Sequence, residues 1–145
     1  MKPGIDYIGV GCGPLIINEK GEALLLKRGP RSKNEAGYWT LPGGTVEFDE
    51  SVEEAICRET KEEVGVPIEL LHPLNCTDHQ IPAERQHWVS VHYVAKIISG
   101  EPKIMEPEKT SDMCWFKLTE MPSPMSQAAS ESIQDYLRIN HGHSH

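Results

Sequence analysis

Apolar residues in this chain occur in short runs separated by turn residues. Residues 7–17 and 23–27 are rich in aliphatic side chains, and the Asn18–Gly21 turn between them predicts a hairpin. Further strands are predicted over 38–41, 68–74, 87–98 and 113–118. Apolar spacing near 3.6 predicts helices over 52–64 and 128–139. Strands mixed with two helices favour an α/β (α+β) domain with helices packed on a mixed sheet.

The first predicted helix has recognisable signals at both ends. Ser51 followed three residues later by Glu54 fits a capping box, in which each side chain accepts from an unpaired backbone N–H group. Gly65, with Pro67 just beyond it, fits a C-terminal stop. The helix is therefore expected to begin near Val52 and to end near Val64.

The second half of this helix carries acids where an amphipathic helix carries its apolar face. At about 100° per residue, the apolar stripe of residues 52–56 continues through Glu59, Glu62 and Glu63. One interpretation is a solvated acidic face, which would suit an interaction module. The other is the lining of a cleft. Close carboxylates repel one another unless a cation lies among them, and hard oxygen ligands suit Mg²⁺.

Composition narrows the classes of protein. The 145 residues suit one domain, and 22 acidic against 14 basic residues give a net charge of −8, which disfavours binding to a nucleic acid polymer. No apolar run is long enough to cross a bilayer, so no membrane contact is expected. The scattered cysteines suit buried thiols in a reducing, cytoplasmic location; they are Cys12, Cys57, Cys76 and Cys114.

The spacing of the acids around the helix forms a motif. Gly44, Glu50 and the run Arg58–Val66 resemble the Nudix box GX5EX7REUXEEXGU, where U is aliphatic; Thr60 is the one departure, and it is expected at the edge of the stripe. The preceding segment Trp39–Gly44 is similar to the strand and glycine turn of that family. The resemblance implies a Nudix-type α/β/α sandwich around a mixed sheet. We expect one domain over residues 1–140 and a His-rich, disordered tail over 141–145.

The resemblance also implies an activity. Nudix enzymes hydrolyse a nucleoside diphosphate linked to another group, and a MutT-like member would convert a nucleoside triphosphate to a monophosphate and pyrophosphate. The expected cofactor is Mg²⁺, with Mn²⁺ as a substitute. The expected partner is a small-molecule nucleotide, and a homodimer is possible within the family. The alternatives are a pyrophosphatase for ADP-ribose or another nucleotide-sugar, and a non-catalytic nucleotide-binding Nudix domain.

Position in the box implies roles for its residues. Glu59, Glu62 and Glu63 are expected to hold the metal, together with the backbone carbonyl of Gly43. The attacking water would lose its proton to Glu59, to Glu63 or to a carboxylate outside the box. Among the catalytic candidates, Arg58 and Glu50 are expected to orient these carboxylates, as metal sites generally need. Glu47 is a further candidate for this network.

Residues outside the box complete the prediction. Within the run Glu106–Lys109, the resemblance to MutT-like enzymes favours Glu108 as a further metal ligand. The expected substrate-binding residues are Gly43, Gly44, Arg28 and Lys109. The central histidines and the three tryptophans are interpreted as mainly structural, although a loop His79 could contact a base; these residues are His79, His87, His92, Trp39, Trp88 and Trp115.

Overall fold

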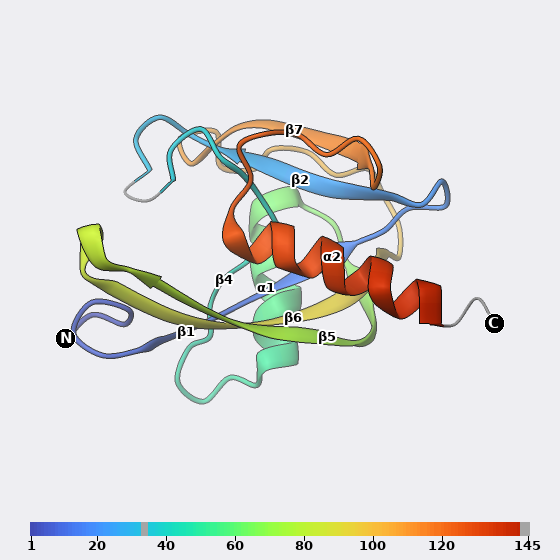
Figure 1. Cartoon of the computed structure of the whole chain (residues 1–145). Coiled ribbons are helices and arrows are strands. Elements are labelled where there is room, and N and C mark those ends of the chain that lie inside the picture. Colours follow the sequence, from blue (N-terminus) through green and yellow to red (C-terminus); the bar gives the residue numbers. More distant parts are fainter. Residues whose placement is uncertain (33–34, 143–145) are drawn as a thin grey trace.

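The computed structural model describes residues 1–32 and 35–142 (Figure 1). Two helices are present among them, α1 (Val52–Val64) and α2 (Gln127–Gly142). The strands are β1 (Gly9–Ile16), β2 (Glu22–Arg28), β3 (Trp39–Thr40), β4 (Gly44–Thr45), β5 (Ile68–Ile81), β6 (Gln86–Ile97) and β7 (Thr110–Lys117). A 3₁₀ turn, Pro82–Glu84, joins β5 to β6.

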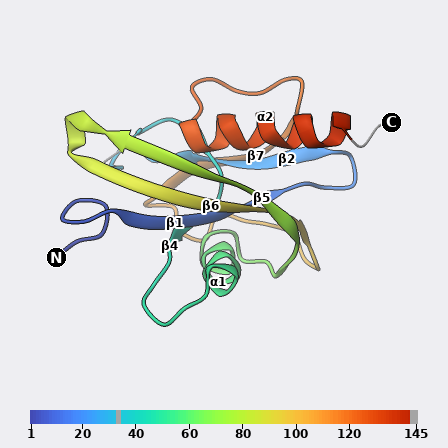
Figure 2. The same cartoon turned by 60° about the horizontal axis from the view of Figure 1, so that its bottom comes forward.

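The strands form two sheets. One has the order β4-β1-β6-β5 and is mixed, because β1 and β6 run parallel while its other pairs are antiparallel. The other has the order β3-β2-β7 and is antiparallel. The helices α1 and α2 lie on opposite sides of these sheets (Figure 2). The predicted α+β class and the helix-covered mixed sheet are confirmed.

The core has two parts because the central strands are buried on both faces. In β2, Leu24 and Leu26 pack in the cluster that contains Ile56 of α1. The alternate residue Leu25 packs in the cluster that contains Ile133 of α2. A strand covered on both faces needs apolar residues at every position, which accounts for the unbroken Leu run.

The predicted hairpin between the first two strands is wrong. A single bridge, Ile17 to Ala23, joins these segments. Beyond it β1 pairs with β6, whereas β2 pairs with β7. The turn itself is as predicted, since Asn18 Oδ1 accepts from the backbone N–H of Glu22. The chain therefore turns at Asn18 and passes from one sheet to the other.

The predicted ends of α1 are confirmed. Ser51 and Glu54 exchange the two hydrogen bonds of a capping box, and Gly65 takes the left-handed conformation with φ of 73°. The buried face, however, follows an i, i+4 row through Ile56, Thr60 and Val64. Thr60 lies at the centre of that face with 0% exposure, not at its edge, and its hydroxyl donates to the carbonyl of Ile56.

Other boundaries differ from the sequence prediction. The strand predicted to end at Leu74 continues to Ile81, so His79 lies in a strand and not in a loop. Helix α2 continues to Gly142, so the backbone of the first two residues of the predicted tail is helical; residues 143–145 lie outside the described residues. The thiols of Cys76 and Cys114 are exposed, and only that of Cys12 is fully buried. Among the described residues, no helix is long and apolar enough to cross a bilayer.

Candidate active site

A cavity of about 630 Å³ lies beside the Nudix-like helix. Such a volume falls within the range of small-molecule sites. One end is lined by carboxylates, and we call it the acid end (Glu59, Glu63 and Glu106). Another part of the wall is formed by the β5–β6 hairpin, and we call it the hairpin end (Thr77, His79, Ser90 and His92).

Two glycines let the acids approach the backbone closely. The N–H of Gly43 donates to Glu63 Oε1 at 3.0 Å. Gly43 has a φ of 153°, and a Cβ there would lie 2.1 Å from the carbonyl oxygen of Cys12. A Cβ on Gly44 would lie 2.3 Å from the carboxyl carbon of Glu59. Glycine is therefore required at position 43 by the backbone conformation and the neighbouring Cys12 carbonyl, and at position 44 by the Glu59 carboxylate.

Arg58 connects the acids of the box. Its Nε donates to Glu50 at 2.5 Å and its Nη2 donates to the same carboxylate at 2.9 Å. Its Nη1 donates to Glu59 at 2.9 Å, and Nη2 also donates to the carbonyl of Thr45 at 3.1 Å. This arrangement uses the planar fork of arginine, and it fixes where the Glu59 carboxylate lies.

The charges of Arg58 and Glu50 support each other. The guanidinium holds the pKa of Glu50 below its usual value, with help from the backbone N–H of Glu47. Glu50 in turn raises the pKa of Arg58. The Glu47 carboxylate lies 3.8 Å from Arg58 and is largely exposed, so it is a peripheral member of the network.

The carboxylates of the acid end are electrostatically strained. Burial is the main cause that raises the pKa of Glu63 to about 8, and the charges of Glu59 and Glu106 contribute to this value. The Gly43 N–H acts in the opposite direction. Burial also raises the pKa of Glu59, although Arg58 opposes this shift. Partly buried acids that repel one another would be relieved by a cation placed among them.

The predicted acidic trio does not point one way. The side chain of Glu59 is 17% exposed and Glu63 lines the cavity, whereas Glu62 is 53% exposed and lies 3.3 Å from Arg58. Among residues 1–32 and 35–142, no three His, Cys, Asp or Glu side chains are gathered as a set that could hold a metal ion. The inward position of Glu59 and Glu63 nevertheless disagrees with a fully solvated acidic face.

The loop before β7 brings a different acid to the site from the one favoured by the sequence. Glu106 lines the cavity and acts on the charges of both Glu59 and Glu63. Glu108 is exposed and is not among the residues that line the cavity. Lys109 lines the cavity and pairs with Glu106 at 3.4 Å. The structure therefore favours Glu106 over Glu108 as the added acid.

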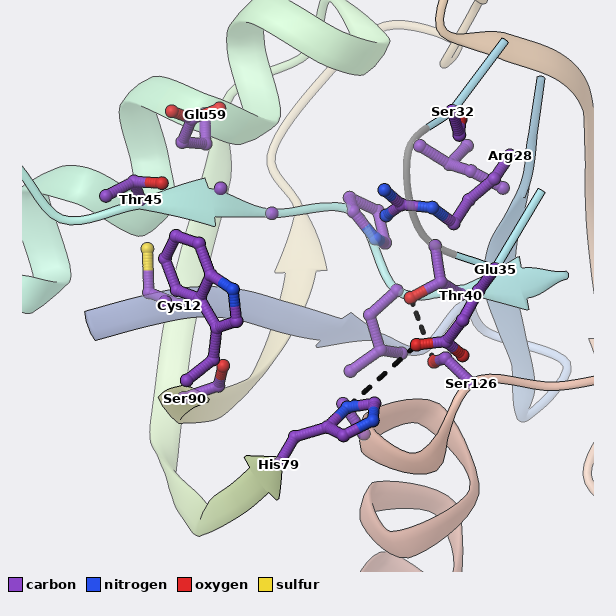
Figure 3. Close-up of a pocket in the computed structure, with 18 of the residues that line it drawn as sticks. Cys12, Arg28, Ser32, Glu35, Thr40, Thr45, Glu59, His79, Ser90 and Ser126 are labelled. Carbon is purple, nitrogen blue, oxygen red and sulfur yellow. Dashed lines mark hydrogen bonds and ion pairs between the residues drawn. The ribbon is translucent and has the colours of Figure 1, made fainter. Parts of the chain in front are cut away.

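The part of the cavity across from Glu59 carries polar groups from several elements. Figure 3 shows Glu59 on one side, with Arg28 and His79 across from it. His79 Nδ1 lies 3.9 Å from Glu35 Oε1. Arg28, predicted to bind substrate, lines the cavity. The two regions that the sequence places far apart thus share one cavity.

The sequence indicated only His79 of the hairpin end, as a residue that could contact a base, and did not reveal the rest. Alternate residues of the second half of β5 and of β6 line the cavity, and they are Thr77, His79, Ile81, Gln86, Trp88, Ser90 and His92. The detectable signal is the period of two in 77–81, which is typical of a strand with one distinct face. Polar residues at these positions concealed it, because a strand is usually recognised by apolar alternation.

The remaining histidines and tryptophans divide between structure and cavity. His87 Nε2 lies 2.8 Å from Asp78 on the outer face. His92 is 3% exposed, and burial lowers its pKa to about 4. Trp39 packs edge-on against Phe116, and Trp115 packs against the α1 core. Trp88 lines the cavity.

Comparison with known proteins shows similarity to several proteins whose names describe hydrolases. A crystal structure of a MutT NUDIX hydrolase from Burkholderia pseudomallei is 40% identical, with a TM-score of 0.84, and the match covers 90% of this chain and 98% of that one. A protein from Methanocaldococcus jannaschii named ADP-ribose pyrophosphatase is 32% identical over 88% of this chain and 72% of its own length. A protein from Stutzerimonas stutzeri named NAD-capped RNA hydrolase NudC is 32% identical over 85% of this chain, but the match spans only 41% of that relative.

The family assignment follows from the extent of the match. Residues 8–136 match the NUDIX domain family, and this range contains helix α1, every strand and the first part of α2. The matched region contains the glycine turn, the Arg58 network and the carboxylates of α1. The chain therefore belongs to the Nudix family of hydrolases.

Proposed function

We propose that this Nudix hydrolase converts a nucleoside triphosphate to a nucleoside monophosphate and pyrophosphate with the help of Mg²⁺. The observation that carries the proposal is the acid end: Glu59 and Glu63 lie partly buried on the wall of a cavity of nucleotide size. Phosphoryl transfer needs positioning and charge neutralisation more than covalent help from a protein. The acid end, with Lys109 beside it, suits that requirement.

The residues of the acid end fit a hard divalent cation. Glu59 and Glu63 offer oxygen ligands whose burial and mutual repulsion disfavour their charged forms when no cation is near. The carbonyl of Gly43 and the carboxylate of Glu106 are further oxygen donors of this region, and Glu62 would join them by turning from Arg58. A bound Mg²⁺ would neutralise phosphate charge and lower the pKa of the attacking water.

The chain's own residues have separable roles in the proposed reaction. Arg58 holds the Glu59 carboxylate in one place through its bond to Nη1, and Glu50 holds Arg58. Glu59 or Glu63 accepts the proton of the attacking water, since both carboxylates line the cavity. The ammonium of Lys109, beside Glu106, and the guanidinium of Arg28, across the cavity from Glu59, would contribute positive charge toward the phosphates.

ADP-ribose hydrolysis is the second candidate. It is favoured by the 32% identity to the Methanocaldococcus protein, which covers most of both chains. A non-catalytic domain is disfavoured, since every Glu and Arg of the box is present. A cytoplasmic location and a homodimer stay predictions.

A substrate panel tests the proposal. Purified protein with Mg²⁺ is offered nucleoside triphosphates, ADP-ribose, nucleotide-sugars and dinucleotides, and the products are separated as pyrophosphate, phosphate and monophosphates. Monophosphate with pyrophosphate from a triphosphate is the expected result. The variant Glu63→Gln should abolish this turnover, while Glu101→Gln, an exposed acid outside the cavity, should not. Turnover confined to ADP-ribose would contradict the proposal.

A further inference from the structure

The hairpin end presents neutral hydrogen-bonding groups to the cavity. In the β5–β6 pairing Thr77 lies opposite Ser90, and His92 follows two residues along the same face. Such diagonal neighbours lie about 7–8 Å apart, close enough for one flat ring to contact both side chains. The cavity face of the hairpin therefore offers a small polar surface. Its residues come from a different segment of the chain than the carboxylates of α1.

The hydroxyl of Thr77 lacks a partner. Thr77 is 4% exposed, and its Oγ1 makes no hydrogen bond within the part of the chain that the structure describes. Buried polar atoms normally have a partner, and each exception calls for an explanation. Because Thr77 lines the cavity, a turn of its side chain would present the hydroxyl to a ligand there, which can supply the missing hydrogen bond.

The proton of His92 can be placed from its neighbours. Asn75 Nδ2 donates to Asp135 Oδ2 at 2.9 Å, and a carboxylate only accepts, so Asn75 Oδ1 faces His92. His92 Nδ1 lies 2.8 Å from that oxygen and therefore carries the proton. The other ring nitrogen, Nε2, is then an acceptor. Burial keeps the ring neutral by lowering its pKa.

We infer that Thr77 and His92 recognise the nucleobase of the substrate, with the Thr77 hydroxyl and His92 Nε2 binding one base edge that carries a donor beside an acceptor. This inference rests on the proposed function, because it assigns the far end of the same cavity to the nucleoside. A site built around such groups discriminates strongly against a ligand that leaves them unpaired. These residues determine specificity and do not take part in bond cleavage.

The variant Thr77→Val tests the inference because it removes only the hydroxyl. Loss of an unpaired buried hydroxyl should leave the fold intact and raise the melting temperature by about 2–4 °C. Loss of a hydrogen bond to the base should raise KM for the preferred nucleotide about 3- to 10-fold, with kcat unchanged. Thr77→Ser, which keeps the hydroxyl, should restore the KM of the wild type.

Two controls separate base recognition from a general effect. Inorganic tripolyphosphate has no base, so its inhibition constant should be the same for the wild type and Thr77→Val. Thr60→Val makes the same chemical change at another buried threonine, which does not line the cavity, and should leave KM unchanged. An unchanged nucleotide KM in Thr77→Val, or an equal loss with tripolyphosphate, would overturn the inference.

Failure of the proposed function can be told apart from failure of this inference. If no triphosphate is turned over, calorimetric binding of nucleoside monophosphates without metal still compares the wild type with Thr77→Val. Weaker binding by the variant would support base recognition whatever reaction the protein catalyses. Equal binding by both proteins, or no binding of any monophosphate by the wild type, would overturn the inference alone.

Discussion

The two ends of the cavity differ in charge and in how their side chains are held. At the acid end, Glu59 and Glu63 are partly buried carboxyl groups whose pKa values are raised by burial, and Arg58 fixes one of them through a charged network. At the hairpin end, Thr77 and His92 are neutral, and the Thr77 hydroxyl has no hydrogen-bond partner among the residues that the structure describes. If a cation lies between the carboxyl groups and the phosphates, the acid end would suit the charged half of the proposed nucleotide substrate and the hairpin end its neutral base.

This difference teaches where each kind of substitution should act. Groups that stabilise the charge developing in the transition state affect kcat. Groups that contact an unreacting part of the substrate affect KM, when they bind the ground state and the transition state equally well. Changes at the acid end should therefore lower turnover. Changes at the hairpin end should weaken binding of the nucleotide.

The largest effect is expected for Glu63→Gln. The amide can still accept from the Gly43 N–H, so the hydrogen bond at this position survives while the charge is lost. We expect kcat to fall by about 10²- to 10⁴-fold, the range for loss of an acid or base in catalysis. Without metal the variant should melt no lower than the wild type, because a neutral amide replaces a buried carboxyl group whose charged form is disfavoured by burial and by nearby acids, and Mg²⁺ should no longer raise its melting temperature.

Glu62→Gln is the matched comparison within the same helix. Glu62 is 53% exposed and contacts Arg58, so its loss should lower kcat far less than the loss of Glu63. Differential scanning fluorimetry with and without Mg²⁺, together with steady-state rates, measures both variants. Equal losses in the two variants would show that all three acids of the box act together.

Arg58→Lys should give the next largest effect. Lysine keeps the positive charge but loses the fork that binds Glu50 and Glu59 together. Loss of such a positioning contact typically costs about 10- to 100-fold in metal affinity or activity. Titration of activity with Mg²⁺ distinguishes a loss of metal affinity from a loss of the maximal rate. A variant with an unchanged rate and an unchanged metal dependence would contradict the role given to Arg58.

The acid end could be predicted from the sequence because its geometry is local. The helix from Val52 to Val64, its cap at Ser51 and the spacing from Gly44 to Val66 depend on neighbouring residues of one helix and one turn. The direction of each acid was less predictable. The buried row runs through Thr60, which the sequence placed at the edge, and this shift turns Glu62 toward solvent.

The hairpin end depends on long-range pairing, and for this reason the sequence did not reveal it. Residues 75–81 are mostly polar, and they form a strand because they pair with Gln86–His92 of β6. Pairing of β1 with β6 and not with β2 is likewise set by burial on both faces. Which of Glu106 and Glu108 lines the cavity depends on how the loop before β7 packs. The segment Glu106–Lys109 has no simple sequence pattern that predicts this packing.

The neutrality of His92 predicts a stability change with pH. Its pKa is about 4 in the folded protein, against an ordinary value of about 6.5. Between these values the unfolded chain binds more protons, so stability should fall as pH falls from about 6.5 to 4, by at most about 3 kcal/mol. Above pH 6.5 this contribution should be constant.

The contribution of His92 is measured by difference. Glu63 acts in the opposite direction, because its raised pKa makes the folded protein bind protons first. The free energy of unfolding in urea is measured for the wild type and for His92→Gln at several pH values between 4 and 8. Subtracting one from the other removes the pH dependence that both proteins share, including that of Glu63. A difference between the two proteins that does not change with pH would mean that His92 has the same pKa in the folded and the unfolded protein.

The smallest effect concerns the loop before β7. Glu106→Gln should lower kcat about 3- to 10-fold, because Glu106 lines the cavity and its charge acts on Glu59 and Glu63 without a bond to either. Glu108→Gln, two residues away and exposed, should leave kcat and KM unchanged. Steady-state rates of the two variants at saturating Mg²⁺ provide the comparison. The reverse ranking would mean that the loop moves to bring Glu108 inward when substrate binds, and the acid end would then be completed only in the complex.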